Sequence, residues 1–359
     1  MSVIFIQPYL TKYRLEFFQE LSELLNDNYK IKFKVVCGVT PESFGKIECA
    51  NFDFEILERR KKGVFYYFKE LSKELKGKNK TIIHFGDFKY ISLYQAIISR
   101  FTNGNMIFLH GQGGYKRKSV ASKIIYNLTL IMVDGYICYN SFCAKELKSK
   151  TFKFLHNKIH HIDNTLYLTP VNHSQAYIKN REPAVVFIGR VRERSGIEFL
   201  LEACEKVRSK IEGFKVHIIG SGAADYISEL ESKYVTTVFH GPIYSQHDIK
   251  KISESCLAGV YGGDAGLSVV HYMSLGLPVI VHNDIYQHMG PEPAYIKNMH
   301  NGLLFERDNN DDLVQKIILL CENNELVEKL SLNSLLAYDQ LSKPSMASKL
   351  VKILKREID

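Results

Sequence analysis

The sequence lacks the cysteine patterns that indicate a disulfide framework or a zinc ribbon. Its seven cysteines are odd in number, scattered along the chain and never spaced C-x-x-C, so we expect a reducing compartment. No stretch approaches the roughly 18 consecutive apolar residues of a membrane span. The nearest candidate, residues 124–133, is interrupted by Asn127 and Thr129. The N-terminal residues lack the basic and apolar regions of a signal peptide and predict a β-strand. A cytoplasmic protein is therefore expected.

Two features that would indicate a bound metal are also missing. No D-x-D motif occurs, so a carboxylate pair that holds a divalent cation on a diphosphate is not expected. The neighbouring His160 and His161 lie in KIHHID, which predicts a strand, and adjacent side chains of a strand point to opposite faces. We therefore expect no metal and no other cofactor.

Acidic residues are scarce in the first half of the chain. Residues 1–165 contain 26 Lys and Arg against 15 Asp and Glu, whereas residues 166–359 contain 21 against 24. A basic half predicts an anionic partner, which the charge balance leaves open as a membrane, a lipid phosphate or a nucleic acid. No nucleic-acid-binding motif is present, so nucleic acid is not expected as the partner.

Two basic segments, residues 58–71 and 114–128, combine clustered cations with aromatic or apolar residues. This pattern predicts either amphipathic helices that lie on an anionic membrane surface or two solvated helix faces. The first alternative would place the protein peripherally on the inner face of the cell membrane.

Short β-branched or aromatic runs alternate with amphipathic helical patterns along the whole chain. This alternation predicts an α/β fold with parallel sheets. We expect two doubly wound Rossmann-like domains, residues 1–165 and 184–341, joined by the polar linker 166–183. They would face a central cleft at the C-terminal ends of their strands. A helix is expected at 119–133, with one apolar face formed by Val120, Ile124, Leu128 and Met132. Strands are expected at 2–7, 31–37, 81–85, 106–110, 135–140 and 158–162, then at 184–189, 215–219, 236–240, 258–263 and 278–282.

An arginine-rich turn follows the first strand of the second half. Its sequence, GRVRERSG at residues 189–196, lies between that strand and a helix. Guanidinium groups bind phosphate oxygens in pairs, and the amides at the start of the next helix add positive potential. Arg190, Arg192 and Arg194 therefore predict a diphosphate clamp, with a merely solvated turn as the alternative.

A second turn contains Gly220, Ser221 and Gly222 between a strand and a helix. The dinucleotide-binding fingerprint requires a third glycine, and Asp225 stands in its place. A nicotinamide-dependent dehydrogenase is therefore disfavoured. The turn is either a tight connection or a phosphate contact.

A third turn lies in VYGGDAGLSVVHYMSLGLPVIVHND, residues 260–284. Gly262, Gly263 and Gly266 would let the backbone approach a ligand closely. A helix that begins near Ala265 would point its free amides at a pyrophosphate.

The order of these motifs resembles a known family. A resemblance to the nucleotide-binding domain of family 4 glycosyltransferases covers nearly all of residues 184–308, and it is carried by GRVRERSGIEFLLEA, IIGSGAADYISEL, GLSVVHYMSLGLPVI and NGLLFERDNNDDL. The first half resembles bacterial polysaccharide transferases at QPYLTKYRLEFFQEL, HGQGG and IDNTLYL. The resemblance implies a GT-B fold, in which the C-terminal helix, residues 342–359 here, packs back onto the first domain.

The chain departs from that family at three positions. The family's paired glutamates fall on Gly263 and His271, and the lysine of its phosphate turn falls on Ser195. In this respect the chain resembles a bacterial capsule and lipopolysaccharide subset that lacks the pair. The resemblance implies that His271 bonds to a ribose hydroxyl, and that Asp264 or Glu292 supplies the missing carboxylate contact to the sugar.

The resemblance also implies a function. The chain would be a hexosyl- or N-acetylhexosaminyltransferase that moves a sugar from a nucleotide diphosphate donor, most often UDP in this family, to an acceptor hydroxyl with retention. The acceptor would be a growing bacterial surface glycan or a lipid-linked saccharide. The alternatives are a nucleotide-sugar epimerase and a degenerate homologue that binds nucleotide without catalysis.

Three groups of site residues follow from this interpretation. Arg190 and Arg194 would stabilise the leaving diphosphate, and His110 would contact the transferred sugar or, in an inverting enzyme, act as the general base. Donor contacts are expected from Gly189, Gly220, Gly263, Asp264, Gly266, Leu267, His271 and Glu292. Weaker acceptor contacts are expected from Tyr13, Arg14 and Gly113.

Overall fold

The computed structural model describes residues 1–41, 47, 49–172 and 181–358. Within these residues the chain forms two compact α/β units. The first comprises Met1–Tyr167 together with the segment that begins at Pro344, and the second comprises Leu168–Lys343. The expected linker comprised residues 166–183. Its first two residues belong to the first unit, its next residues belong to the second unit, and residues 173–180 lie outside the described residues.

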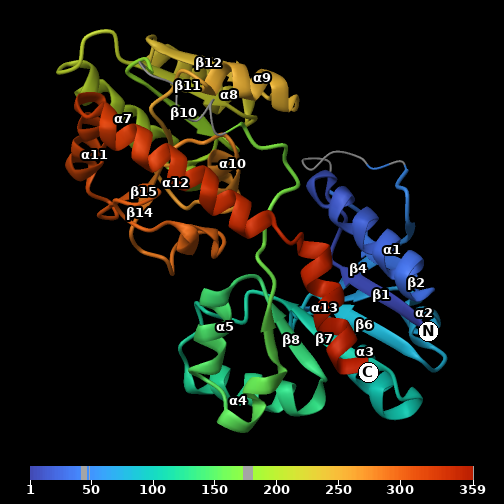
Figure 1. The fold of residues 1–359 in the computed structure, drawn as a ribbon. Helices are drawn as coiled ribbons and strands as arrows, with labels where there is room; N and C mark the ends of the chain where they lie inside the picture. Colours follow the sequence, from blue (N-terminus) through green and yellow to red (C-terminus); the bar gives the residue numbers. More distant parts are fainter. Residues whose placement is uncertain (42–46, 48, 173–180, 359) are drawn as a thin grey trace. The chain divides into compact units, whose positions relative to one another are not determined.

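A parallel sheet with the strand order β3-β2-β1-β6-β7-β8-β9 forms the centre of the first unit (Figure 1). Because β1 lies between β2 and β6, the strand order runs outward from β1 in opposite directions. The C-terminal ends of β1 and β6 therefore form a topological switch point, where such sheets bind ligands. The strands are β1 (Ser2–Gln7), β2 (Lys32–Gly38), β3 (Asp53–Leu57), β6 (Lys80–His84), β7 (Met106–Gly111), β8 (Gly135–Cys138) and β9 (Ile159–His161).

Helices cover both faces of this sheet. Right-handed crossovers place α3, α4 and α5 on one face and α1 on the other. The helices of the first unit are η1 (Lys12–Arg14), α1 (Leu15–Tyr29), α2 (Leu71–Leu75), α3 (Ile91–Asn103), α4 (Val120–Met132), α5 (Ser141–Lys148), η3 (Lys153–Lys158) and α13 (Met346–Ile358). Neither these helices nor any other helix among the described residues has the length and apolarity needed to cross a bilayer.

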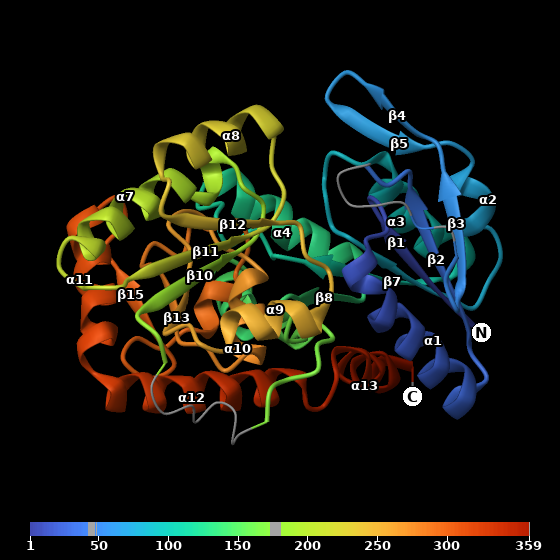
Figure 2. The same cartoon turned by 90° about the horizontal axis from the view of Figure 1, so that it is seen from above.

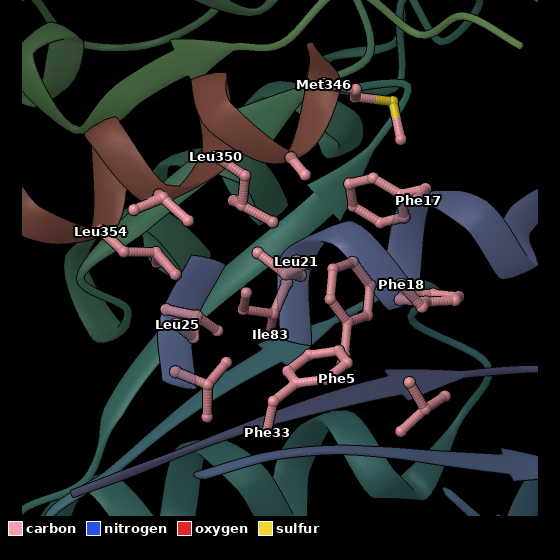
Figure 3. Packing of buried hydrophobic residues seen from close by; sticks show 14 of the residues in the cluster. Phe5, Phe17, Phe18, Leu21, Leu25, Phe33, Ile83, Met346, Leu350 and Leu354 are labelled. Carbon is pink, nitrogen blue, oxygen red and sulfur yellow. The ribbon is translucent and has the colours of Figure 1, made fainter. Parts of the chain in front are cut away.

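The C-terminal helix α13 packs against α1 within the first unit. Its buried Met346, Leu350 and Leu354 point toward the phenylalanine and leucine side chains of α1, as Figure 3 shows. Each such buried side chain contributes about 1.5–3 kcal/mol to folding. An ion pair of 2.8 Å between Lys349 and Asp163 adds a polar contact at the edge of this cluster. Burial of its apolar face therefore holds the last helix in the first unit.

The second unit contains a parallel sheet with the strand order β12-β11-β10-β13-β14-β15. Figure 2 shows α8 on one side of this sheet and α10 and α12 on the other. The strands are β10 (Ala184–Ile188), β11 (Lys215–Ile219), β12 (Thr237–Gly241), β13 (Ala258–Val260), β14 (Val279–His282) and β15 (Gly302–Phe305). The helices are η4 (Glu193–Ser195), α7 (Ile197–Arg208), α8 (Ala224–Lys233), α9 (Gln246–Ser253), α10 (Ser268–Ser274), η5 (Glu292–Tyr295), α11 (Asn310–Glu322) and α12 (Asn324–Ser342).

The helix expected for the basic segment 58–71 is wrong. This segment forms mainly an antiparallel hairpin of β4 (Arg59–Lys62) and β5 (Phe65–Phe68), which Figure 2 shows as a separate ribbon beside β3. Gly63 turns the chain with a φ of +60°, and aromatic residues favour strand over helix. The ring of Tyr66 stacks on Tyr90 at 5.1 Å, which holds the hairpin against the first unit.

Candidate functional site

Backbone hydrogen bonds join two loops at the C-terminal edge of the second sheet. One loop follows β10 and carries the arginine turn, and the other is the glycine-rich loop after β13. The amide of Gly263 donates to the carbonyl of Ser195 (2.9 Å), and the amide of Asp264 donates to the carbonyl of Arg194 (3.1 Å). The arginine turn and the glycine loop therefore form one connected surface.

This close approach requires glycine on both loops. Gly196 has a φ of +64°, and a Cβ at this position would collide with the backbone of Gly262 and Gly263. These glycines thus serve the packing of one loop on the other, and the amide of Gly263 is already bonded within the protein. A contact between Gly263 and a donor stays a prediction.

The ends of β10 and β11 meet in the same way. The amide of Gly189 donates to the carbonyl of Ile219 (3.0 Å), and a Cβ on Gly220 would collide with the carbonyl of Gly189. The amide of Val191 donates to the carbonyl of Ser221 (2.9 Å). A tight connection therefore explains the glycines of this turn, and a phosphate contact of Gly220 stays a prediction.

An ion pair links the side chains of the two loops. The Nε of Arg194 lies 2.9 Å from the Oδ2 of Asp264. The Arg194 side chain is 58% exposed and the Asp264 side chain 13% exposed, so the carboxylate is held from the protein side while the guanidinium extends to the surface. The Nε2 of His282 lies 3.4 Å from the other oxygen, Oδ1, of Asp264. An exposed pair of this kind contributes little to stability, so its main effect is to orient the arginine.

Two buried histidines support the glycine loop. The rings of His282 and His288 stack with their centroids 3.7 Å apart. The Nδ1 of His288 accepts the amide of Ala265 (3.1 Å), and its Nε2 donates to the carbonyl of His282 (2.9 Å). Because one ring nitrogen accepts while the other donates, His288 is neutral. Burial lowers the pKa of His282, and the nearby Asp264 opposes this shift.

The amino end of α10 follows the glycine loop. The amides of residues 263–265 are bonded within the protein, so the amides that a ligand can reach begin at Gly266. Leu267 is the residue that precedes the helix. His271 lies on the helix itself, where burial lowers its pKa to about 4. Its imidazole is therefore neutral at pH 7 and offers one donor and one acceptor.

Glu292 lies beside this amino end of α10. Its carboxylate is buried, and its Oε2 is so close to Gly290 that a Cβ on that glycine would collide with it. A Cβ on Gly266 would lie 3.7 Å from the same oxygen. The amide of Met289 donates to the carbonyl of Ala265 (2.9 Å), which fixes this loop against the glycine loop. The structure therefore brings Asp264 and Glu292 onto two adjoining loops.

The other arginines of the turn differ in their surroundings. Arg190 is half-buried directly after Gly189, and Arg192 is exposed. A guanidinium nitrogen of Arg192 donates to the sulfur of Met289. The structure thus brings Arg192 and Arg194 to the glycine loop and its neighbour, and Arg190 to the end of β10.

A pocket of about 480 Å³ opens in the first unit, at the ends of β1, β6 and β7. Lys89, Lys116 and Arg117 line it, together with one carboxylate, that of Asp87. The HGQGG loop contributes Gly111, Gln112 and Gly114 to its wall. The pocket is therefore polar and predominantly cationic. The sequence predicted its HGQGG wall and the basic segment 114–128, but not Asp87 or Lys89.

His110 lies at the end of β7 and is buried. Its Nδ1 donates to the carbonyl of Ile137 (2.9 Å), so the Nε2 of the neutral ring is an acceptor. The ring packs against Phe5 and Tyr139. Burial and the charge of Arg14 lower the pKa of His110 to about 4. The imidazole is thus held neutral and in one tautomer.

The residues expected to contact the acceptor have structural partners. Arg14 donates to the Oδ1 of Asn164 and, at 3.5 Å, to the carbonyl of Thr165, which ties the first loop to the last segment before the second unit. Tyr13 is exposed beside this guanidinium. Gly113 has a φ of +60°, and its amide donates to the hydroxyl of Tyr136 (3.2 Å). Their contacts to an acceptor stay predictions.

The histidine pair in KIHHID lies in strand β9, as expected. Within the part of the chain that the structure describes, no group of three or more His, Cys, Asp or Glu side chains is arranged to hold a metal ion.

Comparison with known proteins gives a family match for most of the second unit and a fold match for the chain. Residues 170–335, most of the second unit, match the family model described as Glycosyl transferases group 1. Over its whole length the chain is similar to the structure of Alr3699/HepE from Anabaena in complex with UDP. That match has a TM-score of 0.69 and 13% identity, and it covers 99% of both chains. The chain has the GT-B fold of glycosyltransferases, and most of its second unit matches the group 1 family model.

Two further structures are similar to this chain in fold. The apo form of the lipopolysaccharide outer core galactosyltransferase WaaB matches with a TM-score of 0.67 at 14% identity, over 99% of this chain and 100% of that chain. The pneumococcal O-GlcNAc transferase GtfA, in complex with UDP and GlcNAc, matches with a TM-score of 0.70 at 11% identity, over 100% and 99%. At such identities the likeness shows the fold alone. No curated protein matches the chain in sequence.

The sequence missed several residues that support the site. His288 accepts the amide of Ala265, and Gly290 leaves room for the carboxylate of Glu292, but both roles depend on a loop conformation that no sequence motif predicts. Lys89 reaches the pocket of the first unit from the loop after β6, which carries no motif either. The only sequence signal was the closeness of His282 and His288 to the end of a predicted strand.

Proposed function

We propose that this protein is a glycosyltransferase that moves a hexosyl or N-acetylhexosaminyl group from a nucleotide diphosphate donor to a hydroxyl of a bacterial surface glycan or a lipid-linked saccharide. The observation that carries the proposal is the joining of the arginine turn to the glycine loop, which gathers cations and the amino end of α10 at one sheet edge. UDP is the first nucleotide to test, because the HepE and GtfA structures are complexes with UDP.

The arginines would hold the pyrophosphate. Arg194 is anchored through its Nε on Asp264, and its remaining nitrogens extend toward solvent. Charge grows on the leaving phosphate as the sugar departs, so guanidinium groups placed beforehand lower the barrier to transfer. Arg190 and the amides from Gly266 onward would share this task. The proposal requires no metal, because these groups supply the positive charge.

The rest of the donor would meet His271 and Glu292. A neutral imidazole can bond to a ribose hydroxyl as donor or acceptor. The buried carboxylate of Glu292, beside Gly266, would accept a bond from a sugar hydroxyl. In this arrangement Asp264 positions Arg194. Glu292 supplies the carboxylate that the resembled family carries at the position of Gly263.

His110 is the residue of the first unit proposed to contact the transferred sugar. Its Nε2 is an acceptor, and a pKa near 4 makes it a weak base at neutral pH. This low basicity favours a contact over general-base catalysis. It also favours retention, in which the departing phosphate oxygen takes the proton of the acceptor.

The cationic pocket of the first unit would take the acceptor. Lys89, Lys116 and Arg117 would attract a saccharide that bears a phosphate, and a lipid-linked acceptor is such a saccharide. Such an acceptor is presented at a membrane surface, so the proposal includes a peripheral location on the inner face of the cell membrane.

Thermal shift against a nucleotide panel tests the donor site. We expect UDP, among UDP, GDP, dTDP, ADP and CMP, to raise the melting temperature by on the order of 5–10 °C at saturation. Arg190→Ala should abolish the shift, whereas Lys206→Ala should leave it unchanged, because Lys206 forms an exposed ion pair with Asp311. A shift with none of the nucleotides would contradict the proposal and favour a degenerate homologue. Release of an altered free sugar without an acceptor would favour an epimerase.

A further inference from the structure

Helix α4 carries its apolar side chains on its outer face. Val120, Ile124, Leu128 and Ile131 are between 51% and 71% exposed. A helix packed on a sheet normally turns such a stripe inward. Phe152, just before η3, and Phe154, on η3, are exposed as well, and the centroids of their stacked rings lie 5.7 Å apart. The first unit thus presents a large apolar surface, of the kind that marks an interaction site.

The inner face of α4 carries hydrogen-bonded polar residues beside the buried Tyr126 and Leu130, and these bonds fix the orientation of the helix. Asn127 is buried; its amide nitrogen donates to the carbonyl of Lys150 (3.1 Å), and its oxygen accepts the amide of Phe152 (2.8 Å). Lys158 donates to the carbonyls at the C-terminal end of the helix, at 3.0 and 2.7 Å. Rotation of α4 to bury its aliphatic stripe would break these bonds and bury unpaired polar groups. The outward stripe is therefore built into the fold.

Cations flank this stripe, and the segment that contains α4 carries no carboxylate of its own. Between Asp87 and Asp134 the sequence has no acidic residue, whereas it has six basic ones: Lys89, Arg100, Lys116, Arg117, Lys118 and Lys123. The last four lie just before or on α4, and all four are exposed. Asp134 is paired with Arg100. The α4 region is therefore apolar and positively charged together.

We infer that the outer face of α4, with Phe152 and Phe154 beside it, docks the enzyme onto an anionic lipid bilayer. The aliphatic stripe enters the boundary between headgroups and acyl chains, and the flanking cations contact lipid phosphates. Lys116 and Arg117 also line the pocket of the first unit, so the docking surface begins at the pocket wall. The inference deepens the proposed function and rests on it, because it assumes a lipid-linked acceptor. The saccharide of this acceptor occupies the pocket while its lipid stays in the bilayer.

A second copy of the chain is a poorer occupant of this surface. A symmetric contact places the same patch on both partners, so the cations of α4 would face one another. Like charges in contact oppose association, whereas an anionic bilayer supplies the opposite charge. The charge of the patch therefore favours lipid over self-association.

Vesicle sedimentation with the full-length protein tests the inference. We expect binding to vesicles of equimolar phosphatidylglycerol and phosphatidylethanolamine, weaker binding to phosphatidylcholine alone, and partial release by salt. Ile124→Ser combined with Leu128→Ser should lower the ratio of bound to free protein at least about tenfold. Val235→Ser is the matched control, because Val235 is 81% exposed on the second unit; it should leave binding unchanged. Lys118→Ala combined with Lys123→Ala should weaken binding to the anionic vesicles only.

The UDP thermal shift of each variant separates the two proposals. An unchanged shift shows that a variant is folded, so its loss of vesicle binding reports the surface itself. Wild-type protein that stays in the supernatant with both vesicles would overturn the inference, as would undiminished binding of the Ile124 and Leu128 double variant. If the wild-type protein fails to bind vesicles but forms a dimer, and the Ile124 and Leu128 double variant is a monomer, the face would be assigned to a second copy of the chain. Vesicle binding without a thermal shift from any nucleotide of the panel would overturn the proposed function and leave the docking surface standing.

Discussion

The Nε of Arg194 and the Oδ2 of Asp264 lie 2.9 Å apart although 70 residues separate them in the chain. The pair connects the arginine turn to the glycine loop. The family that the sequence resembles carries a lysine one position after Arg194, where this chain has Ser195. The sequence left the direction of the Arg194 side chain open. In the structure, Asp264 fixes one nitrogen of the guanidinium and thereby directs the others outward.

Removal of this guanidinium should weaken donor binding. We expect Arg194→Ala to raise the Kd for UDP about tenfold to a hundredfold, because a charge-assisted bond to phosphate contributes about 1.5–3 kcal/mol. Arg194→Lys should recover little of the loss, since an ammonium lacks the paired nitrogens. Asp264→Ala should have a smaller effect, because it leaves the charge but releases its anchor. Isothermal titration with UDP measures all three, and an unaltered Kd in Arg194→Ala would remove this residue from the clamp.

Local patterns predicted most elements, but they did not predict the pairings between distant loops. The strands at 2–7 and 184–189 and the helix at 119–133 are found close to their expected bounds, because periodicity and β-branched runs are local signals. The hairpin in 58–71 was missed because its clustered cations indicate one face of an amphipathic helix, whereas the aromatic run after Gly63 favours a strand. Spacing showed which residues of α4 share a face but not that this face is exposed, since that depends on bonds from Asn127 to a segment more than 20 residues away.

Glycine at position 196 should be essential to the second unit. Gly196→Ala should lower the free energy of unfolding by about 3 kcal/mol or more and abolish the UDP shift, because the new Cβ combines an unfavourable φ with a collision against Gly263. Gly213→Ala is the matched control: its φ of +72° is similar, but a Cβ there meets nothing within 4 Å. It should cost only about 1 kcal/mol. Urea denaturation compares the two, and equal losses would show that backbone strain alone, without loop packing, sets the requirement.

Buried histidines should make the first unit sensitive to acid. Burial lowers the pKa of His84 from 6.5 to about 3 and that of His110 to about 4. Below pH 6.5 the unfolded chain binds protons that the folded chain does not, so stability is full above this pH and falls as the pH drops toward 4. Between pH 7 and pH 5 each histidine should cost about 2 kcal/mol. Urea denaturation at the two pH values should show a smaller loss for His84→Gln than for wild type, and an unchanged loss for His247→Gln, an exposed histidine.

Replacement of His110 separates a sugar contact from general-base catalysis. His110→Gln keeps a donor for the carbonyl of Ile137 and removes the imidazole nitrogen that would face the sugar. We expect the rate of transfer to fall on the order of a hundredfold while the Kd for UDP stays unchanged, because the proposed contact is made to the transferred sugar and not to the nucleotide.

With a pKa near 4, His110 should add no limb to the pH–rate profile around pH 6.5. Transfer rates measured from pH 5 to pH 8 for both proteins decide the question. A wild-type limb near pH 6.5 that disappears in His110→Gln would instead identify His110 as the base, and an NMR assignment of the anomeric product would then be expected to show inversion.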